Sequence, residues 1–209
     1  VLAITDYTHY WFPELPSFIP ALIVIGALLA LNLPSVKNFG EIEFWFAMIK
    51  IVAICALIIV GAIMVATSFT TPSGAHAQVA NLWNDGGFFP NGVTGFLGAF
   101  QIAVFAFMGS ELVGTTAAET QNPMVTLPKA INSVPVRILI FYVGALIVIL
   151  MVNPWREIDP AKSPFVTMFT LAGIAIAAHI VNIVVLTSAT SSANSGIFST
   201  SRMVYGLSQ

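Results

Sequence analysis

The sequence contains little charge and almost no cysteine. Of its 209 residues only 8% are charged, whereas a soluble domain carries roughly a quarter. Seven Lys and Arg stand against nine Asp and Glu, so no basic excess favours DNA or RNA, and nucleic acid is excluded as a partner. The single cysteine, Cys55, excludes an intramolecular disulfide framework, and its apolar surroundings predict a small buried side chain.

Signatures of enzymes are also missing. The sequence has no HExxH, no GxSxG, no phosphate loop followed by Lys, and no Cys/His cluster. We therefore predict that the protein is not an enzyme and that it uses no cofactor and no metal ion.

Apolar residues dominate what is present. They make up 57% of the chain, and the mean hydropathy is +0.92, so we expect the lipid bilayer to be the main solvent and the fold to be all-α and transmembrane. The chain begins at Val1 and ends at Gln209 within helical patterns, which predicts a segment of a longer protein without a signal peptide.

Uncharged runs predict one transmembrane domain over residues 1–209, since about 20 apolar residues cross ~30 Å of hydrocarbon. The aromatic residues 10–12 suit a membrane interface, and Pro123 and Pro128 predict a loop before the span that starts at residue 134. The predicted spans are 1–10 (partial), 15–36, 41–67, 95–119, 134–152 and 163–193, followed by a cytoplasmic surface helix to residue 209.

The positive charges of the short loops predict the orientation. With alternating sides, four fall on one side and two on the other, so the first side is predicted to be cytoplasmic. The four are Lys37, Lys129, Arg137 and Arg202, and the two are Arg156 and Lys162.

Glu111 is an ionisable residue at predicted membrane depth. It follows Gly109 and Ser110 in the stretch FAFMGSELVGTTAAE, residues 105–119, and residues 86–110 carry no charge. Such a residue marks a pathway by default, and the glycine predicts an interrupted helix whose free backbone groups meet a polar ligand. The alternative is a polar packing point between helices.

Lys50 is the second such residue. It lies about 15 Å along the helix counted from Gly40, near the middle of the bilayer. It either forms an ion pair with Glu111, extends its side chain to an interface, or gains and loses a proton during a cycle. We interpret Glu41 and Glu43 as first-turn carboxylates that favour the start of this helix.

Other polar and aromatic residues leave two interpretations open. His179 fits a hydrogen-bonded core histidine better than a proton relay. Phe105 and Phe107 face lipid or core, or else form a lid over a substrate. Four hydroxyl residues either pack between helices or supply oxygen ligands that face Lys50 or a cation: Thr187, Ser188, Ser191 and Ser192.

Three stretches resemble bacterial amino-acid permeases of the amino acid/polyamine/organocation superfamily, most strongly those for D-serine, D-alanine and glycine. They are FGEIEFWFAMIKIVAI at 39–54, FQIAVFAFMGSELVGTTAAETQNP at 100–123 and SSANSGIFSTSRMVYGL at 191–207, and INSVPVRILIFYV and KSPFV continue the likeness. The resemblance covers essentially the whole chain. It implies a twelve-helix inverted-repeat transporter, of which this chain would carry the end of helix 3 through helix 8.

The resemblance also implies site residues. In that family the broken helices 1 and 6 hold the substrate's ammonium and carboxylate, and residues 105–111 match the break of helix 6. Lys50 would occupy the place of a sodium ion and couple transport to protons, with Thr187 and Ser188 near it. Helix 1 is not in this chain. The residues implied for the substrate are Phe105 as a lid, Phe107, Met108, Gly109 and Ser110 as contacts, and Glu111 as a gating or proton-sensitive carboxylate.

These features together predict a proton-coupled symporter of glycine, D-alanine and D-serine that works by alternating access in a bacterial inner membrane. Its expected partners are the amino acid, the proton and the lipid bilayer. A permease for aromatic amino acids or γ-aminobutyrate is the nearer alternative. A channel or non-transporting membrane scaffold is an alternative from another class.

Overall fold

A computed structural model describes residues 2–32, 36–107, 114, 120, 122–159, 163–174 and 176–208. In this part of the chain the regular structure is helical, apart from an isolated bridge between Thr70 and His76, so the all-α prediction is confirmed. The chain forms two compact units. The first contains Val1–Ala53 and Ile176–Gln209, and the second contains Ile54–Ala175.

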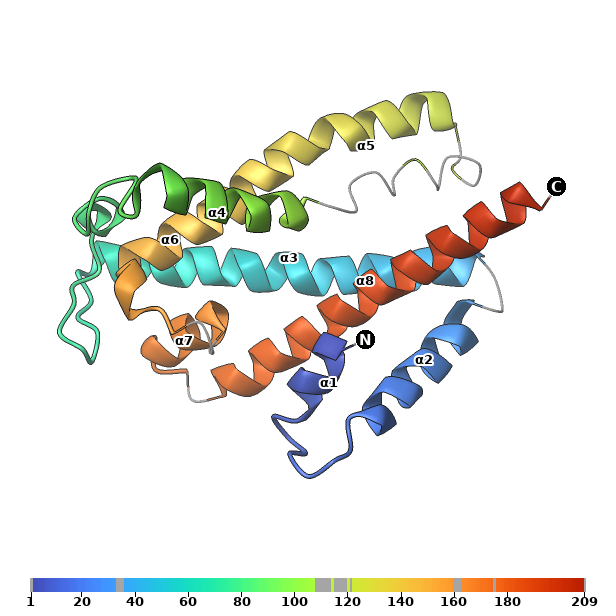
Figure 1. Ribbon diagram of the computed structural model, residues 1–209, viewed down its shortest axis with the longest axis horizontal. Helices are drawn as coiled ribbons and strands as arrows, with labels where there is room; N and C mark the ends of the chain where they lie inside the picture. The colour runs from blue at the N-terminus through green and yellow to red at the C-terminus, as the bar shows by residue number, and fades with distance from the viewer. Residues whose placement is uncertain are drawn as a thin grey trace. The chain divides into compact units, whose positions relative to one another are not determined.

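The first unit is built from four helical segments: α1 (Leu2–Thr8), α2 (Phe18–Asn32), the first part of α3 (Val36–Ala66) and α8 (Ala177–Leu207). Figure 1 shows α1 beside α2 and α8, and these three helices contact one another. Ile4 and Leu28 are fully buried in this unit, because apolar side chains on facing helices exclude each other's solvent.

The end of α1 is tied to the start of α8 by aromatic side chains. The indole Nε1 of Trp11 donates a hydrogen bond of 3.0 Å to Nδ1 of His179, and the two rings are stacked at 6.4 Å between centroids. His179 is therefore hydrogen-bonded as predicted. However, its side chain is exposed rather than in the core, because it lies at the rim of the helices beside residues 10 and 11.

The second unit contains the rest of α3 and seven further helical elements of the described residues. These seven are η1 (Val79–Leu82), α4 (Gly92–Ala106), α5 (Pro123–Arg137), the π-helix η3 (Ile138–Val143), α6 (Gly144–Val152), η4 (Trp155–Glu157) and α7 (Pro164–Leu171). Its core is a cluster in which α3, α6 and α7 meet, and the buried members include Leu57, Met64, Ala77, Val148, Ile149, Val152 and Met168. Cys55, predicted to be buried, is a free and only partly buried thiol.

Two helical stretches among the described residues are long and apolar enough to cross a membrane, Gly40–Ala66 and Pro123–Val152. Only 17% and 11% of their most apolar windows are buried within the chain, so most of their side chains are left for lipid or for other helices. Phe18–Ala30 and Gly92–Val104 are shorter apolar helices. The first stretch covers nearly the same residues as the predicted span 41–67, and that it crosses a membrane stays a prediction.

The prediction of a loop around Pro123 and Pro128 is wrong, because residues 123–152 form one continuous helical run. Pro123 opens α5, at a position where its missing N–H would be unpaired in any case. Pro128 and Pro135 lie inside α5, and the π-helical turn η3 follows directly. Such a turn shifts the backbone hydrogen bonds by one residue, and here it immediately follows the prolines.

The predicted span 163–193 is also interrupted. α7 ends at Leu171, and Gly173 has a φ of +78°, a left-handed conformation that glycine adopts without strain and that commonly ends a helix. α8 then runs unbroken from Ala177 to Leu207. The turn therefore lies near residue 173, inside the predicted span. At residue 193, where the span was predicted to end and a surface helix to follow, α8 continues without a break.

The long connection after α3 is folded onto the end of α6. The side-chain amide of Asn81 donates hydrogen bonds of 2.8 Å to the carbonyl oxygens of His76 and Met151. The backbone N–H of Gln78 also donates to the Met151 carbonyl, at 2.9 Å. These bonds satisfy a carbonyl of the last turn of α6 that has no partner within the helix.

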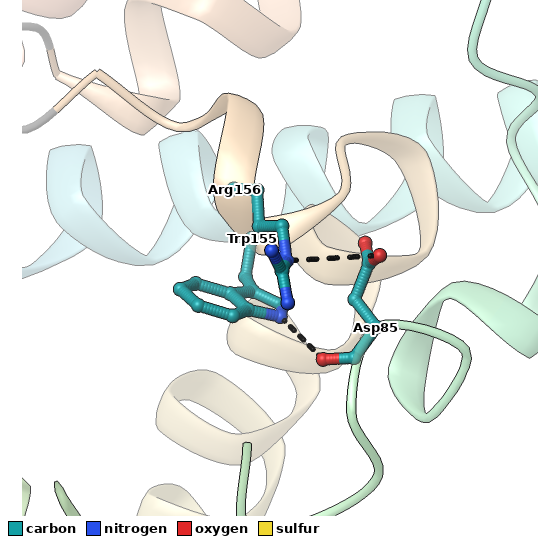
Figure 2. A network of polar contacts seen from close by, with 3 residues as sticks. All are labelled: Asp85, Trp155 and Arg156. Carbon is teal, nitrogen blue, oxygen red and sulfur yellow. Dashed lines mark hydrogen bonds and ion pairs between the residues drawn. The ribbon is translucent and has the colours of Figure 1, made fainter. Parts of the chain in front are cut away.

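A second contact holds this connection to η4 (Figure 2). The indole Nε1 of Trp155 donates a hydrogen bond of 3.1 Å to the backbone oxygen of Asp85. Nε of Arg156 lies 3.8 Å from Oδ1 of Asp85, and its guanidinium lies 5.1 Å from the centre of the Trp155 ring. Both partners of the ion pair are exposed, so it stabilises this region little.

Candidate functional site

Lys50 is placed by α3 inside the apolar stretch Gly40–Ala66. Its ammonium Nζ donates a hydrogen bond of 2.7 Å to the hydroxyl oxygen of Ser191 on α8. The two residues are 141 positions apart in the sequence and belong to the same compact unit. The contact gives the partly buried amino group of Lys50 a hydrogen-bonding partner from the protein, which a buried polar group needs.

Ser191 is the centre of the arrangement, and its side chain is 1% exposed. While its oxygen accepts from Lys50, its own hydroxyl donates to Oε1 of Glu43. Glu43 and Lys50 are seven residues apart on α3, so they lie on the same face, two helical turns from each other. One buried hydroxyl therefore connects a cation to a carboxylate.

The second carboxylate oxygen of Glu43, Oε2, is buried, and no residue that the structure describes donates a hydrogen bond to it. The interpretation of Glu43 as a first-turn carboxylate is wrong, because α3 already begins at Val36. Glu43 is therefore a full two turns inside the helix, beyond the range of the macrodipole effect. The suggested pairing of Lys50 with Glu111 is untested, because Glu111 lies outside the described residues.

The two hydroxyl residues predicted near Lys50 lie on α8, one turn before Ser191. Thr187 donates a hydrogen bond of 2.9 Å to the carbonyl oxygen of Val184, which is back-bonding to its own helix. Ser188 is partly buried, and its carbonyl accepts a hydrogen bond of 3.1 Å from Ser192. Neither hydroxyl has a described contact with Lys50, so their role near a cation site stays a prediction.

The predicted substrate-binding stretch is described only at its beginning. α4 ends at Ala106, and Phe107 follows in a turn. The ring of Phe107 stacks on that of Tyr142 in η3, with 5.8 Å between the centroids and 17° between the planes. Phe105 lies in the last turn of α4, but its side chain is outside the described residues, as are Met108, Gly109, Ser110 and Glu111.

Two residues of this region escaped the sequence-based prediction. Glu43 looked like an ordinary helix-start carboxylate, and Tyr142 was not distinguished from its apolar neighbours. Ser191 was named only as one of four similar hydroxyls. A signal for Glu43 was nevertheless present, since its spacing of seven residues from Lys50 puts both on one helical face.

An apolar helix of membrane length, with a lysine and a glutamate that share a buried hydroxyl, is the arrangement expected of a membrane protein with a polar site among its helices. The chain belongs to the amino acid permease family, whose model matches residues 1–209. The protein is thus of a transport family and is not an enzyme, as the absence of enzyme motifs predicted.

Several bacterial relatives are similar to this chain. It is 62% identical over 209 residues to the D-serine/D-alanine/glycine transporter of Escherichia coli strain K12, and the matched region is 100% of this chain and 44% of that protein. Amino-acid permease AapA of Bacillus subtilis strain 168 is 55% identical over 207 residues, covering 99% and 45%. DL-alanine permease SerP2 of Lactococcus lactis is 48% identical over 209 residues, covering 100% and 45%.

The chain therefore spans less than half the length of these relatives. No solved structure matches it significantly. The predicted resemblance to amino-acid permeases is confirmed by both the family match and the relatives.

Proposed function

We propose that the full-length permease is a secondary active transporter that carries small neutral amino acids, namely glycine, D-alanine and D-serine, together with protons. The observation that carries the substrate proposal is the 62% identity, over the entire chain, to a protein named for these three substrates. A relative named for DL-alanine supports the same class of substrate.

Proton coupling is proposed from the surroundings of Lys50. A lysine can gain and lose a proton, and a buried serine hydroxyl at 2.7 Å from its nitrogen accepts from the ammonium form. In the protonated state the ammonium occupies, in this proposal, the place of a sodium ion. In this proposal Thr187 and Ser188, one turn before Ser191 on α8, supply further hydroxyl groups near that place.

The proposed substrate site is the stretch from Phe105 to Glu111, after α4. Backbone groups freed at a helix break bind the ammonium and carboxylate of a zwitterion. In this proposal Phe107, Met108, Gly109 and Ser110 contact the substrate, Phe105 closes over it, and Glu111 acts as a gate. The stacking of Phe107 on Tyr142 supports this by fixing the position of one aromatic ring of the stretch.

The proposed setting is a multi-pass protein of a bacterial inner membrane with twelve helices in an inverted repeat. Transport proceeds by alternating access, in which inward- and outward-facing states differ in their affinity for substrate and proton. The two membrane-length stretches and the family match support a membrane location.

Uptake by the purified full-length permease in proteoliposomes tests this proposal. Labelled glycine is offered under an imposed pH gradient or an imposed sodium gradient, each alone. We expect accumulation with the pH gradient only, and competition by D-serine and D-alanine but not by phenylalanine or γ-aminobutyrate. Accumulation driven by sodium alone, or inhibition by phenylalanine but not by D-serine, contradicts the proposal.

A further inference from the structure

The hydrogen bonds around Ser191 form a continuous donor chain inside the first unit. Nζ of Lys50 donates to Oγ of Ser191, and that hydroxyl donates to Oε1 of Glu43. All three groups are among the described residues of one compact unit. Each link already has a proton between a donor and an acceptor, which is the arrangement that proton transfer requires.

We propose that Glu43 is the proton acceptor of Lys50, and that the buried hydroxyl of Ser191 relays the proton between them. This inference rests on the proposed function and adds to it the route by which the coupling proton leaves the lysine. In the transfer, an N–H bond of the Lys50 ammonium breaks as a new O–H bond forms on Ser191. The original hydroxyl proton of Ser191 moves to Oε1 of Glu43, so ammonium and carboxylate become amine and carboxylic acid.

Oε2 of Glu43 is buried, and no described residue donates a hydrogen bond to it. Among the described contacts, the hydrogen bond from Ser191 to Oε1 is therefore the one that positions this carboxyl group for the relay. The transfer also neutralises two partly buried charges at once, which removes the cost of keeping both of them ionised away from water.

The position of Glu43 gives the relay a direction. Glu43 lies between Lys50 and the N-terminal end of α3, the end that carries Lys37 and that the loop charges predict to be cytoplasmic. A proton released from Glu43 therefore leaves toward the cytoplasm, and Lys50 is reloaded from outside in the outward-facing state. One proton is carried inward in each cycle.

Other ionisable groups on these elements lie elsewhere along the two helices. On α3, Glu41 is exposed. On α8, His179 accepts its hydrogen bond from Trp11, and Arg202 lies about three turns beyond Ser191, with its guanidinium 5.2 Å from the centre of the Phe198 ring. Among the described contacts of Ser191, Lys50 and Glu43 are the ionisable partners.

The test compares two activities of the full-length permease in proteoliposomes. Accumulation of glycine driven by a pH gradient needs net proton movement, whereas exchange of labelled for unlabelled glycine at equal pH does not. A gradient of about one pH unit is worth about tenfold accumulation for one proton per substrate. We expect Glu43→Gln to lose that accumulation and to keep exchange near the wild-type rate, because glutamine cannot take up the proton.

Ser191→Ala carries the test independently, since it removes one oxygen atom and little volume. We expect Ser191→Ala, too, to lose the accumulation driven by the pH gradient and to keep exchange near the wild-type rate. Glu43→Asp keeps a carboxylate and should retain part of the accumulation. Glu41→Gln removes an exposed carboxylate two residues away on α3 and is the matched control, with both activities unchanged.

Wild-type accumulation in both Glu43→Gln and Ser191→Ala overturns the relay. So does equal loss of accumulation and exchange in Glu43→Gln when Ser191→Ala behaves as wild type, because Glu43 is then structural. A wild-type permease that does not accumulate glycine with a pH gradient rejects the proposed function itself. The two failures are therefore distinguishable.

Discussion

Gly61 of α3 lies directly against Val148 of α6, with no space for a side chain between them. A Cβ at position 61 would overlap Cγ1 of Val148 and lie 2.9 Å from Cε of Met168. Close approach of helices at small residues is the usual way in which membrane helices gain packing contacts. This contact joins the membrane-length stretch of α3 to the core of the second unit.

Gly61→Ala is expected to lower the stability of the full-length permease by about 1–3 kcal/mol, the usual cost of overpacking a core. Adding Val148→Ala removes the overlapping methyl groups and should restore part of the loss. Gly26→Ala is the control, since among the described residues nothing beyond its chain neighbours and its own helix backbone lies within 4 Å of an added Cβ there. Thermal unfolding in detergent measures all three, and a Gly61→Ala protein as stable as wild type contradicts the packing.

Asn81→Ala removes the amide that holds the connection after α3 to Met151. Two carbonyl oxygens lose a donor, and a buried group that loses its hydrogen bond costs about 1–3 kcal/mol. We expect a lower melting temperature and faster proteolysis between residues 67 and 91. Asn84→Ala, an exposed amide in the same connection, should change neither quantity.

The ion pair of Arg156 with Asp85 should contribute little, in contrast to its neighbour Trp155. Arg156→Ala is expected to change stability by less than about 1 kcal/mol, because both charges are solvated. Trp155→Phe removes the hydrogen bond to the Asp85 backbone and should cost more. If Arg156→Ala is the more destabilising of the two in thermal unfolding, this ranking is wrong.

Tyr142 is expected to affect substrate affinity through Phe107. Aromatic stacking is worth about 0.5–1.5 kcal/mol, so Tyr142→Ala should raise the KM for glycine by up to about tenfold. Tyr142→Phe keeps the stacked ring and should leave KM near the wild-type value. Equal KM values for wild type and Tyr142→Ala would remove the pair from the proposed substrate site.

The helices of this protein were predictable from its sequence to different degrees. A helix over 41–67 follows from one long apolar run, and the structure has a helix over nearly these residues as the main part of α3. Pro123 and Pro128 were misleading, because local propensity predicts a loop where the structure has α5. The turn at Gly173 was missed, since one glycine in an apolar run carries no signal of its φ angle.

The side-chain contacts of the polar site were also only partly predictable from local sequence patterns. Lys50 could be singled out because a lysine in an apolar run is rare. Its contact with Ser191 spans 141 residues, and that of Ser191 with Glu43 spans 148. No local sequence pattern predicts contacts between residues so far apart in the sequence. The sequence also offered four similar hydroxyl residues as possible partners of Lys50. Spatial proximity had to come from the packing of α3 and α8.

Proton counting tests the central claim, that Lys50 couples proton movement to amino-acid transport, most directly. Glycine uptake and internal pH are followed together in proteoliposomes that contain the full-length permease or its Lys50→Met variant. Lys129→Met, which removes an exposed lysine of α5, is the control. We predict that wild type and Lys129→Met take up protons with glycine, and that Lys50→Met takes up none. Glycine-dependent proton uptake by Lys50→Met at the wild-type ratio would contradict this account.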